Sequence, residues 1–275
     1  MISAYAVASL LGIHESHLAM IRLCIDASGG GKGHRAMAVA GYFAPVKDWS
    51  KFETQWAAAL VEARVEQFHA TDFYSCEGEF NGWDLDPARH AKFAKRFTAI
   101  AESKAGYGIA RGIDVAAFKR VMAPVYATVR TDRTPHRKHT QLMFGVTTAV
   151  HEVCQLMRKR GEAVAVILEG GDGVGEVIEY HMWLKRKRVK WTENLVTMLP
   201  MGKDFLPLQA ADLLAYEMWH HTTGVLGPNP RPPRRPALTR LLQRSRVELR
   251  IASHASLERA IPPFKAFLTR YPAGA

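Results

Sequence analysis

The sequence predicts an α/β layer fold in which helices flank one mixed sheet. A short apolar run at 21–25 is followed by a turn and a second apolar run, which is typical of a β-hairpin. After this hairpin, segments with helical periodicity alternate with short apolar segments, as in α/β proteins. The 275 residues are 48% apolar and 23% charged, an ordinary globular balance. A chain of this length buries a sizeable core without a disulfide or metal staple.

The first half of the chain contains the expected hairpin and two expected helices. The strand at 21–25 is β-branched at both ends, and the glycine-rich turn at 28–33 leads to a partner strand at 36–43. Apolar residues then recur every three or four positions, which predicts a helix over 48–65. Four further expectations follow along the chain: a short strand at 66–70, a helix from Pro87, a strand at 107–113 and a short helix at 115–122.

In the second half of the chain, the expected helices and strands alternate more regularly. Mixed charges and two prolines predict a loop at 124–137. The segment 163–168 is apolar on both faces, as a central strand would be. The other expected elements are a helix at 139–159, a helix at 174–187, a strand at 194–199 and a helix at 206–220.

We expect three parts in the chain. Residues 1–19 form an N-terminal extension without a core pattern, which leaves open whether Met1 or Met20 is the true start. This extension lacks the basic start of a signal peptide, since the first Lys or Arg is Arg22. Residues 20–226 form the main domain. Residues 227–275 comprise a proline-stiffened, Arg-rich linker and a small basic helix-strand-helix tail.

Cysteine content and hydropathy indicate the compartment. The three cysteines lack metal-type spacing and one would be left over in any disulfide pairing, so a reducing, cytoplasmic location is expected. No run reaches the roughly 18 apolar residues that a membrane span requires. The composition also excludes disordered, collagen-like and coiled-coil chains.

The charge distribution favours a polyanionic partner. The net charge is +11, and the segment 227–275 alone carries ten Lys and Arg against two Glu. Such basic blocks suggest nucleic acid, with a solubilising surface as the alternative. Oligomeric state is left open. The candidate nucleic-acid contacts form two groups: Lys185, Arg186, Lys187, Arg188 and Lys190, and then Arg231, Arg234 and Arg235.

Three acidic residues end or interrupt apolar elements. Asp26 ends the first strand, Glu169 ends the central strand, and Asp212 lies on an apolar face of the last long helix. An ionised carboxylate in such a setting is costly without a partner. Converging carboxylates would hold Mg²⁺ or Mn²⁺, and two such ions can clamp a phosphodiester. The alternatives are turn or cap roles for the strand-end acids, and a solvent-facing or Lys-paired Asp212.

Two further polar residues lie in an aromatic setting. His69 is a candidate proton shuttle or phosphate contact, and Asp72 a candidate metal or supporting ligand. The alternatives are a satisfied core histidine and a helix cap. Asp172, three residues after Glu169, is a weaker ligand candidate. The glycine turn is not a P-loop, because Asp26 and Gly33 stand where such a loop needs Gly and Ser or Thr.

Three motifs together resemble the bacterial and phage domain of unknown function 3800 family: IDASG at 25–29, FHATD at 68–72 and PLQAADLLAY at 207–216. The resemblance covers about residues 20–220. It implies a ribonuclease-H-like fold, metal-dependent nuclease activity, and Asp26, Glu169 and Asp212 as metal ligands. One departure is Ala27, where the family usually has Glu.

These observations predict a two-metal nuclease that acts on RNA or DNA, with Gln209 orienting Asp212. A catalytically silent module of the same fold, binding nucleic acid or protein, is the alternative. A hydrolase of small phosphorylated compounds is a third possibility, but the basic tail favours a polymer. The choice between RNA and DNA, and between endo- and exonuclease, is not set by the sequence.

Overall fold

A computed structural model describes residues 20–31, 33–128, 140–227, 235–244 and 248–252, together with positions 255, 257–259, 262 and 266. Six strands form one sheet in the order β5-β4-β1-β2-β3-β6. Their bounds are Ile21–Gly29 for β1, Ala36–Pro45 for β2, Tyr107–Asp114 for β3, Val164–Glu169 for β4, Leu195–Met201 for β5 and Glu248–Ile251 for β6.

The sheet is mixed because its two halves are built differently. Strands β1, β2 and β3 form an antiparallel meander, whereas β4 pairs in parallel with β1 and β5 in parallel with β4. Parallel pairing requires a crossover connection, and helices supply it here. The short β6 pairs in parallel with β3 at the opposite edge.

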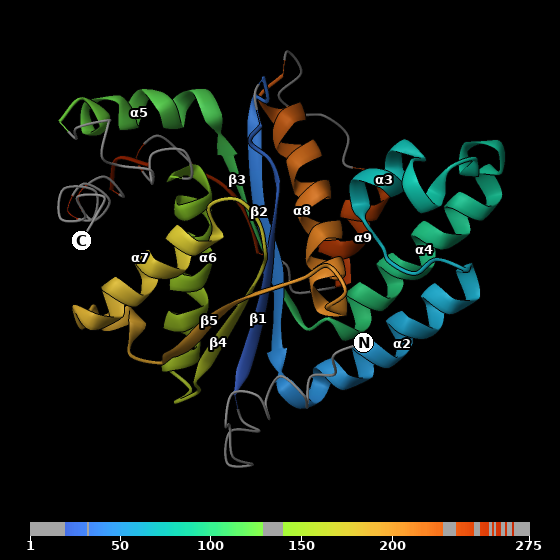
Figure 1. The fold of residues 1–275 in the computed structure, drawn as a ribbon, viewed down its shortest axis with the longest axis horizontal. Coiled ribbons are helices and arrows are strands. Elements are labelled where there is room, and N and C mark those ends of the chain that lie inside the picture. Colours follow the sequence, from blue (N-terminus) through green and yellow to red (C-terminus); the bar gives the residue numbers. More distant parts are fainter. Residues whose placement is uncertain are drawn as a thin grey trace.

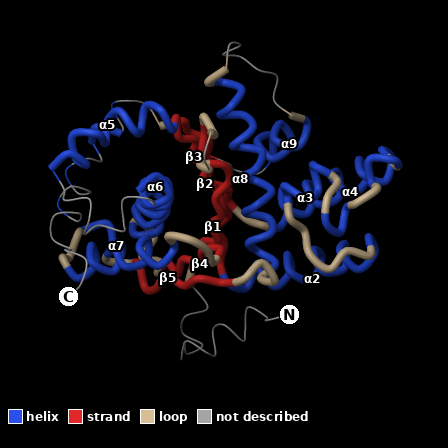
Figure 2. The backbone as a smooth tube through the Cα atoms, turned by 45° about the horizontal axis from the view of Figure 1, so that its top comes forward, coloured by secondary structure: helices blue, strands red, loops and turns tan. Residues whose placement is uncertain are grey.

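Helices cover both faces of the sheet, which is visible edge-on in Figure 1 and as the central red layer of Figure 2. One face carries α5 (Val115–Thr128), α6 (Thr140–Arg158) and α7 (Val174–Arg186). On the other face α8 (Leu206–Val225) lies against β1 and β2. The outer helices on that side are α2 (Val46–Ala63), α3 (Ala70–Ser75), α4 (Pro87–Lys104) and α9 (Pro236–Arg244).

Strand alternation divides the core between these two faces. On β1, Leu23 and Ile25 belong to the apolar cluster under α6 and α7, whereas Cys24 belongs to the cluster under α8. The second cluster is rich in aromatic rings from α2 and α4, including the fully buried Trp56 and Phe97. Short 3₁₀ turns at Gly78–Phe80 (η2), Trp83–Leu85 (η3) and Lys190–Thr192 (η6) complete the connections.

The α/β class, the mixed sheet and the initial hairpin are confirmed, and the long helices begin and end within a few residues of the expected positions. Two expectations are wrong. Residues 66–69 have no strand structure, and the expected loop from 124 begins as helix, because α5 continues through Pro124 to Thr128. The apolar spacing of Val121, Met122 and Val125 across this proline keeps one helix face buried.

The C-terminal segment packs on the sheet more closely than a tail behind a linker would. Strand β6 hydrogen-bonds to β3, and α9 contacts α4 and α8. Leu238 and Leu241 of α9 are buried. The N-terminal extension expected at 1–19 lies outside the described residues. Within the described part of the chain, no helix is long and apolar enough to cross a membrane.

Candidate active site

Two carboxyl groups stand side by side where the pairing of β1 with β4 ends. The expectation that Asp26 ends its strand is wrong, because β1 continues to Gly29 through its pairing with β2. Strands β1 and β4 pair in parallel up to Ile25 and Leu168, and the next residues are Asp26 and Glu169. Since side chains alternate along a strand, these two acids point to the same face of the sheet, the face that α8 covers. Asp26 is 7% exposed, and its Oδ1 accepts a hydrogen bond from the Ala27 N–H at 2.6 Å. A side-chain hydrogen bond also links Asp26 to Glu169.

Helix α8 brings the third acid to this place. Its residues from Leu206 to Met218 are all buried, because the helix lies between the sheet and the outer helices. Asp212 is 9% exposed, and its Oδ2 accepts from the Ala70 N–H at 2.7 Å. Its charge acts on Asp26 and is itself affected by Glu169. The structure therefore brings together Asp26, Glu169 and Asp212, which we call the acidic centre.

Burial and like charge perturb the acidic centre. Burial away from water raises the pKa of Asp26 well above its usual range, and the nearby Asp212 and Glu169 raise it further. Burial also raises the pKa of Asp212, although the Ala70 N–H, His69 and Lys203 oppose this effect. A hydrogen bond between two carboxyl groups requires a shared proton. Burial and the neighbouring acids therefore disfavour the charged form of Asp26.

The donor set suits a hard divalent cation, but its present arrangement is not a finished ligand set. All donors are carboxylate oxygens, which Mg²⁺ and Mn²⁺ prefer. No three His, Cys, Asp or Glu side chains within the described ranges stand in an arrangement that could hold a metal ion. A bound cation would have to compete with the protonated form that burial favours at Asp26.

Segment 66–70 passes over the acidic centre and is held by side chains. Glu79 accepts hydrogen bonds from the N–H groups of residues 66 and 67, Gln209 from that of residue 68 and Asp212 from that of residue 70, at 2.6 to 3.2 Å. A strand would direct such groups to a neighbouring strand. These acceptors replace that neighbour, which explains why the expected strand at 66–70 is absent.

Gln209 is the central support of this segment. It is 2% exposed, and its Oε1 also accepts from the Trp56 Nε1–H at 2.8 Å. Its Nε2 donates to the Lys203 carbonyl at 3.0 Å. Gln209 therefore acts on Asp212 through segment 66–70, since both side chains, one helical turn apart, hold the same stretch of backbone.

His69 and Asp72 lie at the edge of the acidic centre. The His69 Nδ1 is 3.0 Å from Asp72 Oδ2, and the two side chains are 29% and 41% exposed. His69 is thus not an enclosed core histidine; it is the N-cap residue of α3, and Asp72 lies in the first turn of that helix. The proximity of His69 lowers the pKa of Asp212 and connects the pair to the acidic centre electrostatically.

Two residues near the acidic centre escaped the sequence reasoning. The Lys203 Nζ lies 3.4 Å from Glu169 Oε1, and Glu79 holds the start of segment 66–70. Neither has a periodic or motif signal, since each is a single charge in a turn. Asp172 does share a pocket of about 170 Å³ with Asp26 and Glu169, at the ends of β1 and β4.

The first basic group lies far from the acidic centre. Helix α7 begins just after Glu169 and runs for 13 residues, roughly 20 Å, before Lys185 and Arg186 end it. Lys185 donates to the Leu195 carbonyl. The remaining members of that group, Arg186, Lys187, Arg188 and Lys190, are exposed.

The second basic group is described only at Arg235, since Arg231 and Arg234 lie outside the described residues. Arg235 Nε is 3.7 Å from Oε1 of the fully buried Glu217. Its guanidinium lies 4.0 Å from the centre of the Tyr74 ring. Arg235 thus attaches the start of the C-terminal segment to α3 and α8.

No protein-family model matches the chain, and no curated protein matches it either. The resemblance to the domain of unknown function 3800 family stays a prediction.

Proposed function

We propose that the chain is a metal-dependent nuclease with a ribonuclease-H-like fold that hydrolyses phosphodiester bonds of RNA or DNA. The observation that carries the proposal is the acidic centre. Its three carboxyl groups come from the first strand, the end of a later strand and a following helix, in the order that the family resemblance implies. An antiparallel meander extended by two parallel strands also agrees with this fold.

The residues of the acidic centre would hold Mg²⁺ or Mn²⁺, which supplies an activated water and neutralises developing charge at the phosphate. Segment 66–70 keeps Asp212 oriented through the Ala70 N–H and places His69 at the edge. Because the Nδ1 of His69 is engaged by Asp72, its Nε2 is left to bind a phosphate oxygen or to pass a proton. Burial of the acids excludes bulk water and strengthens their hold on a cation.

The proposed site is compatible with Ala27 at the position where the family usually has Glu. Ala27 packs against the cluster under α6 and α7, on the opposite face from Asp26. Ala27 and Asp172 line the same pocket. Asp172 therefore supplies this pocket with a carboxylate, which Ala27 lacks.

A silent binding module of the same fold is the second candidate. It is favoured by the Asp26–Glu169 hydrogen bond and by the lack, within the described ranges, of a ready three-ligand group. The two candidates differ in one property. A nuclease needs the charges of the acidic centre and a divalent ion, whereas a binding module needs neither.

The test is cleavage of labelled single-stranded RNA and DNA with Mg²⁺, Mn²⁺ or a chelator. We expect metal-dependent cleavage that Asp26→Asn and Asp212→Asn abolish, since amides keep the shape and remove the charge. Asp84→Asn, which changes an exposed acid in η3, is the matched control and should cut normally. Equal cleavage by Asp26→Asn and the wild type would refute the proposal. Metal-independent binding without cleavage would support the binding module.

A further inference from the structure

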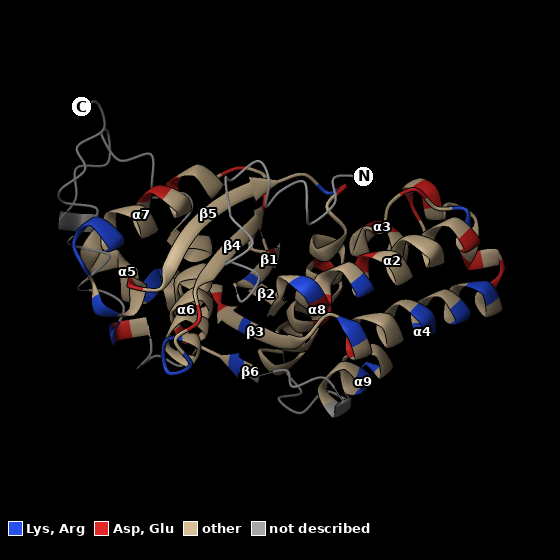
Figure 3. Cartoon of the chain, turned by 90° about the horizontal axis from the view of Figure 1, so that it is seen from below, with Lys and Arg blue, Asp and Glu red and all other residues tan. Residues whose placement is uncertain are grey.

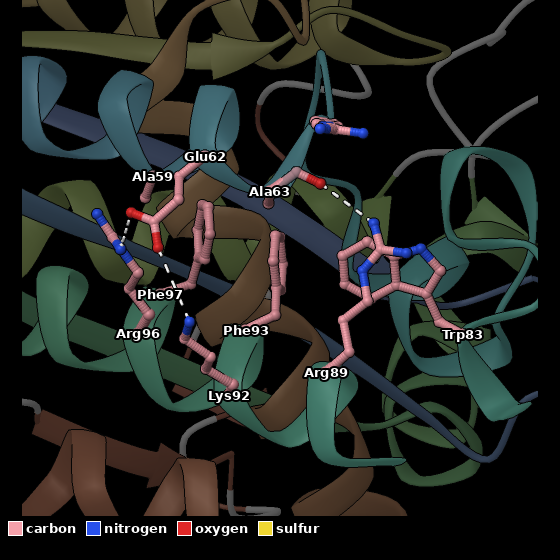
Figure 4. Close-up of a pocket in the computed structure, with 10 residues that line it drawn as sticks. Ala59, Glu62, Ala63, Trp83, Arg89, Lys92, Phe93, Arg96 and Phe97 are labelled. Carbon is pink, nitrogen blue, oxygen red and sulfur yellow. Dashed lines mark hydrogen bonds and ion pairs between the residues drawn. The ribbon is translucent and has the colours of Figure 1, made fainter. Parts of the chain in front are cut away.

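A second pocket lies away from the acidic centre, between the C-terminal half of α2 and the N-terminal half of α4 (Figure 4). Its volume is about 300 Å³, at the lower end of the range for small-molecule sites. One end is closed by Trp83 of η3. None of its lining residues belongs to the acidic centre or to the two basic groups considered above.

The floor of this pocket is aromatic. Phe93 and Phe97 are buried and stack on each other with ring centres 4.1 Å apart. Trp83, also buried, meets Phe93 edge-on at 5.1 Å. The rings pack mainly on one another, and only 4% of Trp83 and 5% of Phe93 is exposed, so the floor offers a small, rigid apolar area to a flat ligand group.

The rim of the pocket is strongly cationic. The pocket is lined by four cations, Arg64, Arg89, Lys92 and Arg96, and by one acid, Glu62. Arg96 bonds Glu62, and the Lys92 Nζ is 4.0 Å from Glu62 Oε1. One carboxylate cannot neutralise four cations, so the rim keeps an excess of positive charge. Figure 3 shows the Lys and Arg bands along α4 that contribute to it.

Arg89 is oriented by contacts that leave donors for a ligand. Its guanidinium lies 3.9 Å from the Trp83 ring centre and donates one hydrogen bond to the Ala63 carbonyl at 3.2 Å. A guanidinium has five N–H donors in a planar fork that matches phosphate. The contact with Ala63 caps the end of α2, but it occupies only one edge of this fork.

Arg64 stands in a backbone conformation that usually selects glycine. It follows the last residue of α2 with a φ of 57°, a left-handed conformation in which a side chain is disfavoured. Its side chain is exposed and lines the pocket. Cys76 and Arg188 adopt the same conformation elsewhere in the chain, so what distinguishes Arg64 is that its exposed guanidinium lines the pocket.

We propose that this pocket binds a nucleotide unit, with the phosphate held by Arg64 and Arg89 and the base placed on the aromatic floor. A flat ring joined to a phosphate matches both the floor and the excess charge. Lys92 and Arg96 add attraction at the rim. The unit is either a free mononucleotide or one residue of a single strand, which share this chemistry.

The test is calorimetric titration with AMP, adenosine, inorganic phosphate and a short single-stranded oligodeoxyadenylate. Hydrogen bonds to a charged phosphate are strong, so Arg64→Ala should weaken nucleotide binding by roughly tenfold or more. Lys95→Ala removes a charge from an exposed position of α4 outside the pocket, and should change binding by less than about twofold. AMP should bind more tightly than adenosine or phosphate alone.

Arg89→Ala removes the cap of α2 and could unfold the site, so Arg89→Lys is the companion variant. Arg89→Lys keeps the charge, loses the fork and should weaken binding less than alanine does. If AMP binds and depends on Arg64, the free nucleotide is an occupant. If only the oligonucleotide binds in this way, the single strand is the occupant.

Binding that is absent for both probes, or equal in Arg64→Ala and Lys95→Ala, would overturn the proposal. The inference is independent of cleavage at the acidic centre. Asp26→Asn should leave AMP binding unchanged, so failure of the nuclease proposal and failure of this one are distinguishable.

Discussion

Replacing Gln209 by methionine tests how the acidic centre is held together. The substitution keeps an unbranched side chain of similar length but removes the amide. It leaves two donors without their acceptor: the Trp56 Nε1–H and the Phe68 N–H. Both residues are at most 2% exposed, so water cannot replace the lost partner.

The expected cost follows from these two donors. A buried donor left unsatisfied costs about 1–3 kcal/mol, so the loss in free energy of unfolding should be roughly 2–6 kcal/mol. The lost bond to the Lys203 carbonyl adds little, because Lys203 is an exposed turn residue. The expected loss is a large fraction of the roughly 5–15 kcal/mol that holds a typical domain folded.

Urea unfolding followed by circular dichroism, in metal-free buffer, measures this loss. Gln155→Met changes an exposed glutamine on α6 and should stay within about 0.5 kcal/mol of the wild type. Hydrogen exchange at the amide of residue 68 should also accelerate in Gln209→Met. A loss below about 1 kcal/mol, with unchanged exchange at that amide, would show that Gln209 does not support segment 66–70.

Three further outcomes are expected. Burial and acidic neighbours raise the pKa of Asp26 in the folded state. Its contribution to the free energy of unfolding is therefore complete below about pH 4 and is lost as pH rises through the folded-state pKa. In metal-free urea titrations, Asp26→Asn should reduce this loss of stability with rising pH. Truncation after Leu226 should cost about 3–6 kcal/mol in thermal or urea unfolding, because it removes the buried Leu238 and Leu241 and uncovers the β3 edge. Glu79→Gln should speed hydrogen exchange at residues 66 and 67 while costing only about 1 kcal/mol. An unchanged pH profile, an unchanged unfolding curve or unchanged exchange, respectively, would contradict these expectations.

The sequence predicted those elements whose signal is local. The hairpin follows from two apolar runs around a glycine turn, and α2 follows from its periodic apolar residues. Asp26 and Glu169 could be proposed as neighbours because each follows an apolar strand segment, although β1 itself continues past Asp26 to Gly29. Their convergence with Asp212 required only that α8 cover that face.

The errors occur where distant partners decide the structure. Segment 66–70 has strand-like composition, but its N–H groups bond Glu79, Gln209 and Asp212, of which two are more than 140 residues away. A helix and a strand in the tail were expected and are present as α9 and β6, but the pairing of β6 with β3 was not foreseen, because the tail sequence does not reveal the open edge of β3. Arg235 stays a predicted phosphate contact, but its ion pair with Glu217, which lies in an apolar helix face, was not foreseen.

Two buried acids of the same region show why the acidic centre points to function. Glu217 is fully buried on α8, and burial raises its pKa, but Arg235 lies 3.7 Å away and opposes the rise. Arg235 therefore supplies Glu217 with a compensating positive charge from the chain itself. Asp26 has no cation of this kind beside it; its interactions are with Asp212 and Glu169, which make its charge more costly, and with one backbone N–H. A structural role would favour a neutral residue at that position. We propose that a ligand from outside the folded chain explains the retained carboxyl, and a divalent cation would offset much of the charge of the three acids.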